Sequence, residues 1–137
     1  MIKVGNMDEV LVPCLVDSGA MNTLLPGWVA ALAGIDCNAA PAKTLGVAGS
    51  ATSARMVTTS LAIGAHSWEA EVGFCEPWPR GWGLLGQLSF FRYFLVTFRA
   101  VDFELEIELS LTSAERQDAA AARCPVTPAA FASWFTR

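Results

Sequence analysis

Histidine is almost absent from this sequence, and its cysteines are not paired in the way that metal sites require. His66 is the single histidine, and the four cysteines form no Cys-x-x-Cys motif. Structural zinc sites are built from clusters of these two residue types, so no metal and no other cofactor is expected. A serine or cysteine hydrolase also needs a histidine beside its nucleophile, whereas the segment around His66 is typical of a turn.

Charge of either sign is sparse. The nine basic residues are scattered singly and the formal net charge is −4, so the sequence lacks the basic patch expected of a nucleic-acid-binding protein. Charged residues make up 16% of the chain, against roughly 25% in typical soluble domains. This deficit suggests that part of the surface is buried against a second copy of the chain.

Long hydrophobic runs are missing as well. The longest apolar stretch, residues 88–98, is interrupted by Arg92 and is too short to span a bilayer, so no membrane partner is expected. Asp8 and Glu9 near the start do not fit a signal peptide. We therefore expect reduced thiols and a cytoplasmic location, and the alanine-rich composition suggests a bacterial source.

One segment combines a carboxylate with apolar flanks. Cys14-Leu15-Val16 leads into Asp17, the small residues Ser18-Gly19-Ala20 follow, and Leu24-Leu25 return the chain to the interior. Asp-Ser-Gly is by itself an ordinary turn sequence. Here it lies between two runs that are expected to be buried, a position that places an acid where hydrophobicity would otherwise be favoured. Asp17 is therefore the candidate catalytic group.

A second segment, residues 43–57, has two arms of polar or β-branched residues around a tip of small ones, Gly46 to Gly49. This pattern predicts a hairpin that could close over a ligand, because little side-chain bulk holds its tip in place. A plain surface hairpin remains the alternative.

The rest of the chain predicts mostly strands, at residues 2–4, 9–16, 61–63, 68–74, 95–98 and 103–109, with Pro13 favouring a sheet edge. Within residues 103–109, apolar residues alternate with glutamates, so this strand should have one dry face and one solvated face. A helix is predicted from Pro26 to Ala33, stopped by Gly34, with Trp28, Val29 and Leu32 on its buried face.

The composition changes near the end of the chain, and two units are expected. Residues 1–111 form a β domain, and residues 112–137 form a helical extension that starts with a capping box at Thr112-Ser113-Ala114-Glu115. Phe131, Trp134 and Phe135 in this extension are expected to cover the barrel or to meet a partner chain.

Three landmarks, in this order, resemble the retropepsin-like aspartic proteases: Asp17-Ser18-Gly19-Ala20, the hairpin tip at Gly46 to Gly49, and Leu84-Leu85-Gly86 followed by a helical turn. The resemblance covers roughly residues 2–109. It implies a mainly β fold, a small closed β-barrel with a flap hairpin and one or two short helices, to which residues 112–137 add an extension without a retroviral counterpart. The implied activity is that of an aspartic endopeptidase acting on peptide or protein substrates.

Peptide hydrolysis by carboxylates alone needs two of them sharing a proton, one acting as base toward water and the other as acid toward the carbonyl oxygen. This chain has only one Asp-Ser/Thr-Gly motif. A homodimer with Asp17 from each chain across a two-fold axis would supply the second acid, as in the retropepsins. Two facing carboxylates titrate as a coupled pair, so we expect an acidic pH optimum.

The resemblance also assigns roles to single residues. Ser18 would hydrogen-bond across the dimer axis beneath the two acids, and Gly19 would allow close backbone approach. Leu84, Leu85 and Gly86 would be structural. Substrate-binding positions would be Ala20, Met21, Asn22, Gly46, Val47, Ala48 and Gly49.

This chain departs from the retroviral pattern at two linked positions. Met21 and Gln87 stand where retroviral enzymes carry an acid and an arginine that pair between subunits. Both partners are missing together, so no charge is stranded, but the mode of dimerisation is open. Two alternatives are a catalytically inactive retropepsin-fold module for dimerisation or peptide binding, and an unrelated monomeric β-barrel with Trp68, Trp78 and Trp82 lining a ligand pocket.

Overall fold

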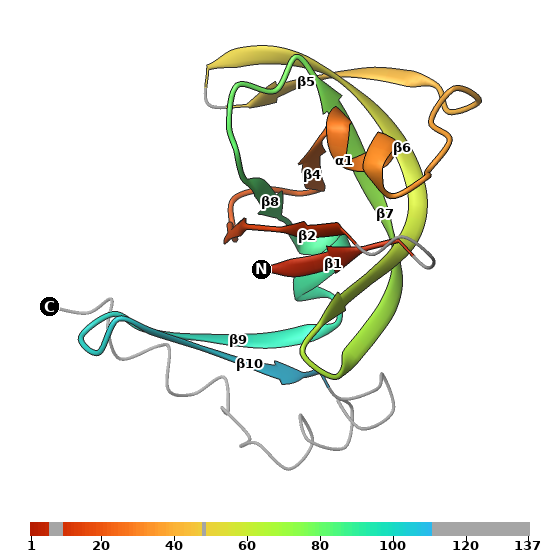
Figure 1. Cartoon of the computed structure of the whole chain (residues 1–137). Coiled ribbons are helices and arrows are strands. Elements are labelled where there is room, and N and C mark those ends of the chain that lie inside the picture. Colours follow the sequence, from red (N-terminus) through yellow and green to blue (C-terminus); the bar gives the residue numbers. More distant parts are fainter. Residues whose placement is uncertain (6–9, 48, 111–137) are drawn as a thin grey trace, which may run out of the picture.

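The chain folds into a mainly β structure whose principal sheet curls into half a barrel (Figure 1). The computed structural model describes residues 1–5, 10–47 and 49–110. Its strands are β1 (Ile2–Val4), β2 (Val10–Val12), β3 (Cys14–Val16), β4 (Thr23–Pro26), β5 (Ala42–Val47), β6 (Ser50–Ile63), β7 (His66–Glu76), β8 (Gly83–Leu85), β9 (Phe94–Arg99) and β10 (Glu104–Leu109). The helices are α1 (Gly27–Leu32) and η1 (Gln87–Phe91), a single π-helical turn.

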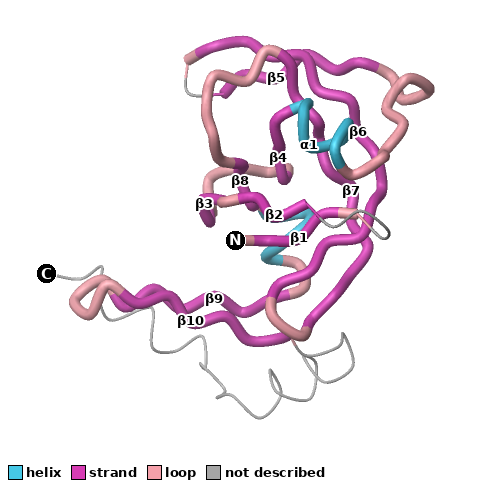
Figure 2. Tube along the Cα trace, in the orientation of Figure 1, coloured by secondary structure: helices cyan, strands magenta, loops and turns pink. Residues whose placement is uncertain are grey.

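Eight strands share the curled sheet in the order β2-β1-β6-β7-β4-β8-β3, with β5 added to β6, while β9 and β10 pair as a separate ribbon. Figure 2 shows this ribbon on the β1 side of the sheet. Most pairs are antiparallel, but β3 with β8 and β4 with β7 are parallel. The two parallel pairs bring distant parts of the chain together around residues 14–26.

The long β6–β7 hairpin is the frame of the sheet. Its turn is Gly64-Ala65, where Gly64 has φ of 56°, and Ile63 pairs with His66. Along β7 the side chains of Ala70, Val72 and Phe74 are buried, as the alternating sequence predicted. These residues belong to the main core cluster, together with Leu25 of the neighbouring strand β4 and Phe90 of η1.

The predicted strand at residues 9–16 is two strands, and Pro13 separates them. Proline lacks the N–H that a continuous ladder would need. The break lets β2 pair antiparallel with β1 while β3 pairs in parallel with β8. The prediction of an edge position is confirmed, since β2 and β3 are the two ends of the sheet order.

Helix α1 lies where the sequence predicted it, but of the three residues predicted for its buried face only Val29 is buried. Gly34, with φ of 66°, follows the helix as expected. Val29 is fully buried, whereas Trp28 and Leu32 are 48% and 62% exposed. Trp28 and Leu32 are four residues apart and therefore share one side of the helix. The other side, with Val29, Ala30 and Ala33, meets the core because a helix of only six residues has one narrow contact face.

The core consists of two clusters on opposite sides of β4 and β8. Successive residues of a strand point to opposite faces. Leu25 and Leu85 accordingly belong to the main cluster, and Leu24 and Leu84 to the smaller one. The main cluster also contains Ile2, Val4, Val12, Val29, Ala30, Leu61, Ala70, Val72, Phe74, Phe90 and Phe94. The smaller cluster, with Ala54 and Cys75, forms the floor beneath the β5–β6 hairpin.

The ribbon of β9 and β10 has the predicted alternation but an incompletely covered apolar face. Glu106 is exposed and pairs with Arg99 at 3.1 Å, so the glutamate side is a solvated face, as predicted. On the other side, Phe98 and Leu105 remain 55% and 39% exposed. The strand begins at Glu104 instead of the predicted Phe103, which lies in the preceding turn with φ of 54°.

The predicted helical extension, residues 112–137, lies outside the described residues. Within the residues that are described, no helix combines the length and apolar character needed to cross a membrane.

Candidate active site

Asp17 stands at the end of β3, where the parallel pairing with β8 stops. Its N–H donates to the carbonyl oxygen of Leu85 at 3.1 Å. The turn that follows is closed by the N–H of Ala20, which donates to the Asp17 carbonyl at 3.1 Å, and by the N–H of Gly19, which donates to Asp17 Oδ1 at 2.9 Å. The half-buried carboxylate is thus oriented by a backbone donor of its own turn.

Gly19 is required by close approach. A Cβ at this position would lie 3.2 Å from Asp17 Oδ1, which is tighter than ordinary van der Waals contact. A larger residue would push the carboxylate away from the Gly19 N–H. The close backbone approach expected of Gly19 is therefore an approach to the carboxylate itself.

The segment Leu84-Leu85-Gly86 supports this turn from below. Leu84 and Leu85 pair with Leu15 and Val16 in the parallel β3–β8 ladder. Gly86 is buried, and a Cβ there would clash with the carbonyl group of Asn22. This position has room for a hydrogen atom only, which explains the glycine.

Helix η1 begins directly after Gly86 and offers its free N–H groups to the turn. The N–H of Gln87 donates to the carbonyl of Ala20 at 2.8 Å, and that of Leu88 donates to the carbonyl of Met21 at 2.9 Å. The first N–H groups of a helix have no partner within it and are free for such contacts. Backbone groups alone therefore fix the peptide units that follow Asp17.

Two side chains complete the support, and sequence reasoning missed both roles. Gln87 Nε2 donates to the carbonyl of Ser18 at 2.7 Å, and the buried hydroxyl of Thr23 accepts the N–H of Gly86 at 3.1 Å. Behind them, the hydroxyl of Ser89 donates to the carbonyl of Glu71 at 2.8 Å and accepts the N–H of Thr23. The available signal was a hydroxyl residue, Thr23, placed directly before two buried leucines.

A hollow of about 390 Å³ lies between the Asp17 turn and the β5–β6 hairpin. Most predicted site residues line it: Asp17, Gly19, Ala20, Met21, Asn22, Gly46, Val47 and Leu84. Leu24 and Leu45 line it too and were not predicted. Leu45 could have been found, because it lies two residues before Val47 and so on the same face of the strand. Among the described residues that line this hollow, Asp17 is the only ionisable one.

The other predicted site residues lie elsewhere. Ser18 faces a neighbouring hollow that Gln87, Leu88 and Phe91 also line. Gly49 is exposed in the hairpin turn with φ of 81°. Leu85 and Gly86 are buried beneath the Asp17 turn. Ala48 lies outside the described residues.

The predicted hairpin is confirmed as β5 and β6, with Val47 opposite Ser50 and Leu45 opposite Thr52. These four residues share one face of the two strands. Leu45 and Val47 pack against the smaller core cluster, so this is the inner face of the hairpin. Its outer residues, such as Gly46 and Ala51, are exposed.

The three tryptophans of the small-barrel alternative do not line one pocket. Trp68 packs against Phe90 and Phe94 of the main cluster, with a ring-centroid distance of 4.7 Å to Phe94. Trp78 and Trp82 pack against the smaller cluster instead. That part of the alternative is wrong.

The cysteines of the described part of the chain, Cys14, Cys37 and Cys75, are free thiols. Burial raises the pKa of Cys14 to about 11, and burial also raises the pKa of Cys75 to about 11 against the lowering effect of a hydrogen bond with Thr52. Thiols are nucleophilic as thiolates, so these two are inert near neutral pH. In the same described ranges, no three His, Cys, Asp or Glu residues gather closely enough to hold a metal ion.

The chemistry available in the hollow is that of one oriented carboxylate under an apolar hairpin. A carboxylate can act as a general base or, when protonated, as a general acid, but one group cannot do both in the same step. A complete acid–base site therefore requires a second group from outside the described chain. Comparison with protein-family models, with curated proteins and with solved structures found no match to this chain.

Proposed function

We propose that this chain is a retropepsin-like aspartic endopeptidase that hydrolyses peptide bonds as a homodimer. The observation that carries the proposal is the way in which the fold holds the Asp17 turn. Its turn is held by backbone hydrogen bonds to Leu85, Gln87 and Leu88 and lies opposite the β5–β6 hairpin across a single hollow. An ordinary Asp-Ser-Gly turn on the surface needs neither a buried glycine beneath it nor a hairpin across from it.

The fold is consistent with this assignment. The Asp17 turn, the β5–β6 hairpin and the helical turn after Gly86 occur in the order that the resemblance implies. In the proposal the sheet is the retropepsin barrel and the hairpin is its flap. Leu45 and Val47 on the inner face would then lie over the substrate backbone.

The second carboxylate is proposed to be Asp17 of the partner chain, related by a two-fold axis. Three large apolar side chains close to the turn are exposed in the single chain: Leu15 at 51%, Met21 at 55% and Leu88 at 53%. The N–H of Leu88 donates to the carbonyl of Met21, so the backbones of these two residues are adjacent. A two-fold interface joins the same patch of both chains, and an apolar patch here would bring the two Asp17 turns together. Met21 would replace the ion pair of retroviral enzymes with an apolar contact.

In this dimer the two carboxylates share one proton. The ionised one takes a proton from the attacking water, and the protonated one donates to the carbonyl oxygen of the scissile bond. The rigid backbone support keeps both acids in place while their protonation states exchange. Activity should be highest at acidic pH, where one proton is retained by the pair.

The test is cleavage of a diverse peptide mixture between about pH 4 and 7, read by mass spectrometry, for the native chain and for Asp17→Asn. The amide cannot act as base, so cleavage should fall by at least about a hundredfold. Asp36→Asn is the matched control. Asp36 also accepts the N–H of the residue two positions later, Asn38, at 2.8 Å, but it does not line the Asp17 hollow.

Equal cleavage by Asp17→Asn and the native chain would overturn the proposal. If neither cleaves, although the protein is folded and dimeric, the inactive peptide-binding module becomes the better assignment. Loss of cleavage in Asp17→Asn with full cleavage by Asp36→Asn is the result that we expect.

A further inference from the structure

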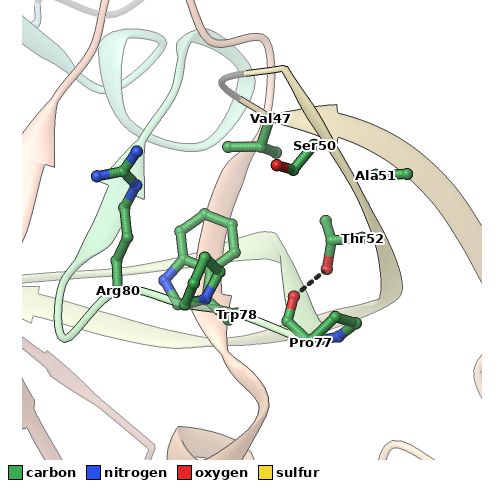
Figure 3. Close-up of a pocket in the computed structure, with 8 residues that line it drawn as sticks. Val47, Ser50, Ala51, Thr52, Pro77, Trp78 and Arg80 are labelled. Carbon is green, nitrogen blue, oxygen red and sulfur yellow. Dashed lines mark hydrogen bonds between the residues drawn. The ribbon is translucent and has the colours of Figure 1, made fainter.

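A second hollow, of about 220 Å³, adjoins the one at Asp17. It lies between the inner face of the β5–β6 hairpin and the loop that joins β7 to β8, and it is drawn in Figure 3. Val47 lines both hollows, so they are neighbours under the same hairpin. A ligand that lies along the hairpin past Asp17 would therefore meet this second hollow.

The walls of this hollow are fixed by hydrogen bonds. The hydroxyl of Thr52 donates to the carbonyl of Pro77 at 2.7 Å, which ties the hairpin to the loop. Trp78 Nε1 donates to the carbonyl of Trp82 at 2.9 Å, and both tryptophans pack against the smaller core cluster. Figure 3 shows the ring of Trp78 between the loop and Val47. The hollow is thus a built feature of the fold, and its walls are mainly apolar.

Arg80 is the one charged residue among the described residues that line this hollow. Its guanidinium lies 5.0 Å from the ring centroid of Trp82, a distance typical of a cation–π contact that holds the side chain in place. Within the described ranges, no carboxylate forms an ion pair with it. A cation beside an apolar hollow, in a chain of net charge −4, can attract an anionic group.

We propose that this hollow is a specificity subsite that binds an apolar side chain of the substrate, while Arg80 binds the carboxylate of a nearby Asp or Glu in the same peptide. A cavity of about 150 Å³ can hold a benzene ring, so the volume suits an aromatic or branched side chain. The guanidinium can form two parallel hydrogen bonds to a carboxylate. The inference rests on the proposed function and adds a substrate class, peptides with an acidic residue close to an apolar one.

The test separates binding from catalysis. A random-sequence peptide pool is passed at pH 6, where peptide Asp and Glu are ionised, over immobilised chain carrying Asp17→Asn. Retained peptides are sequenced by mass spectrometry. The same chain is compared with added Arg80→Gln, Arg80→Lys and, as a remote change of equal charge, Arg99→Gln.

We expect acidic residues near apolar ones to be enriched among retained peptides. Enrichment should fall about twofold to fivefold with Arg80→Gln, the range of an exposed ion pair. It should fall less with Arg80→Lys, which keeps the charge but loses the paired hydrogen bonds, and it should persist with Arg99→Gln. Equal enrichment with Arg80→Gln, an equal loss with Arg99→Gln, or retention of no peptide would each overturn the subsite.

A parallel assay with Asp17 intact keeps the two proposals apart. Residue frequencies around the cleaved bonds should lose their acidic preference in Arg80→Gln and shift toward basic residues in Arg80→Glu. Retention that depends on Arg80 without any cleavage would remove the protease and leave the subsite. Cleavage with unchanged frequencies would do the reverse.

Discussion

At the scale of the residue, two glycines on either side of β8 differ in whether they could carry a side chain. Gly86 has no room for a Cβ because the carbonyl group of Asn22 lies against it. Gly81, five residues earlier in the loop, has nothing within 4 Å of a Cβ. The obstacle at Gly86 is backbone, which cannot rotate away as a side chain can. A methyl group at this position would therefore force the Asp17 turn or helix η1 to move.

We expect Gly86→Ala to lower the free energy of unfolding by about 1–3 kcal/mol, the usual cost of overpacking. Peptide cleavage should fall further than the loss of folded protein explains, because the displaced peptide unit belongs to the turn that follows Asp17. Urea denaturation and cleavage rates of the folded fraction measure the two effects. Gly81→Ala should change stability by less than about 0.5 kcal/mol. Equal behaviour of the two variants would contradict the packing described here.

At the scale of the element, local patterns predicted most of the strands and helix α1. The alternation along β7, the glycine turn before it and the helix between Pro26 and Gly34 are all set by neighbours in sequence. The face that α1 buries is not local, since it depends on where β2, β4 and β7 happen to lie. A helix with apolar residues on two sides cannot tell from its own sequence which side is covered. The break at Pro13 was similarly hidden, because its cause is the separate partners of β2 and β3.

Helix α1 offers a direct test of the corrected face. Val29→Ala should destabilise the fold by roughly 2 kcal/mol because it opens a cavity in the main cluster. Leu32→Ala removes more carbon atoms but should cost less than about 1 kcal/mol, since Leu32 is 62% exposed. Thermal or urea unfolding of the two variants gives the order. A larger loss for Leu32→Ala would mean that another surface covers it in solution.

The candidate site was predicted to a similar extent and for the same reason. Asp17, Gly19 and the Leu84-Leu85-Gly86 segment carry enough local pattern to be recognised. The amide contact of Gln87 with Ser18 spans 69 residues and leaves no trace in the local sequence. The contacts of Thr23 and Ser89 also leave no trace in the local sequence. Neither does the placement of Val47, Trp78 and Arg80 around the second hollow.

At the scale of the whole molecule, the single chain exposes apolar surface close to the Asp17 carboxylate. Leu88 is 53% exposed beside the turn, whereas Leu32 is an equally exposed leucine on α1, away from it. In the proposed dimer, a charge at position 88 would be buried at the interface without a partner. A charge at position 32 would stay in solvent.

We expect Leu88→Glu to convert the dimer to a monomer in sedimentation and to abolish peptide cleavage. Leu32→Glu should change neither. A Leu88→Glu protein that stays dimeric and active would show that the chains associate through another surface. A native chain that is monomeric at all concentrations would exclude a site built from two copies of Asp17.

The parallel pairing of β3 with β8 also has a consequence for the order of assembly. This pairing joins residues 14–16 to residues 83–85. Closing the long loop between them costs conformational entropy, and contacts between such distant segments form late in folding. Asp17 precedes the whole β6–β7 hairpin, while every group that holds its turn from outside follows that hairpin. In a partly folded chain, Asp17 therefore lies on an unsupported loop. In the proposed protease, the catalytic geometry would form only in the completed fold, so partly folded copies would not cut one another.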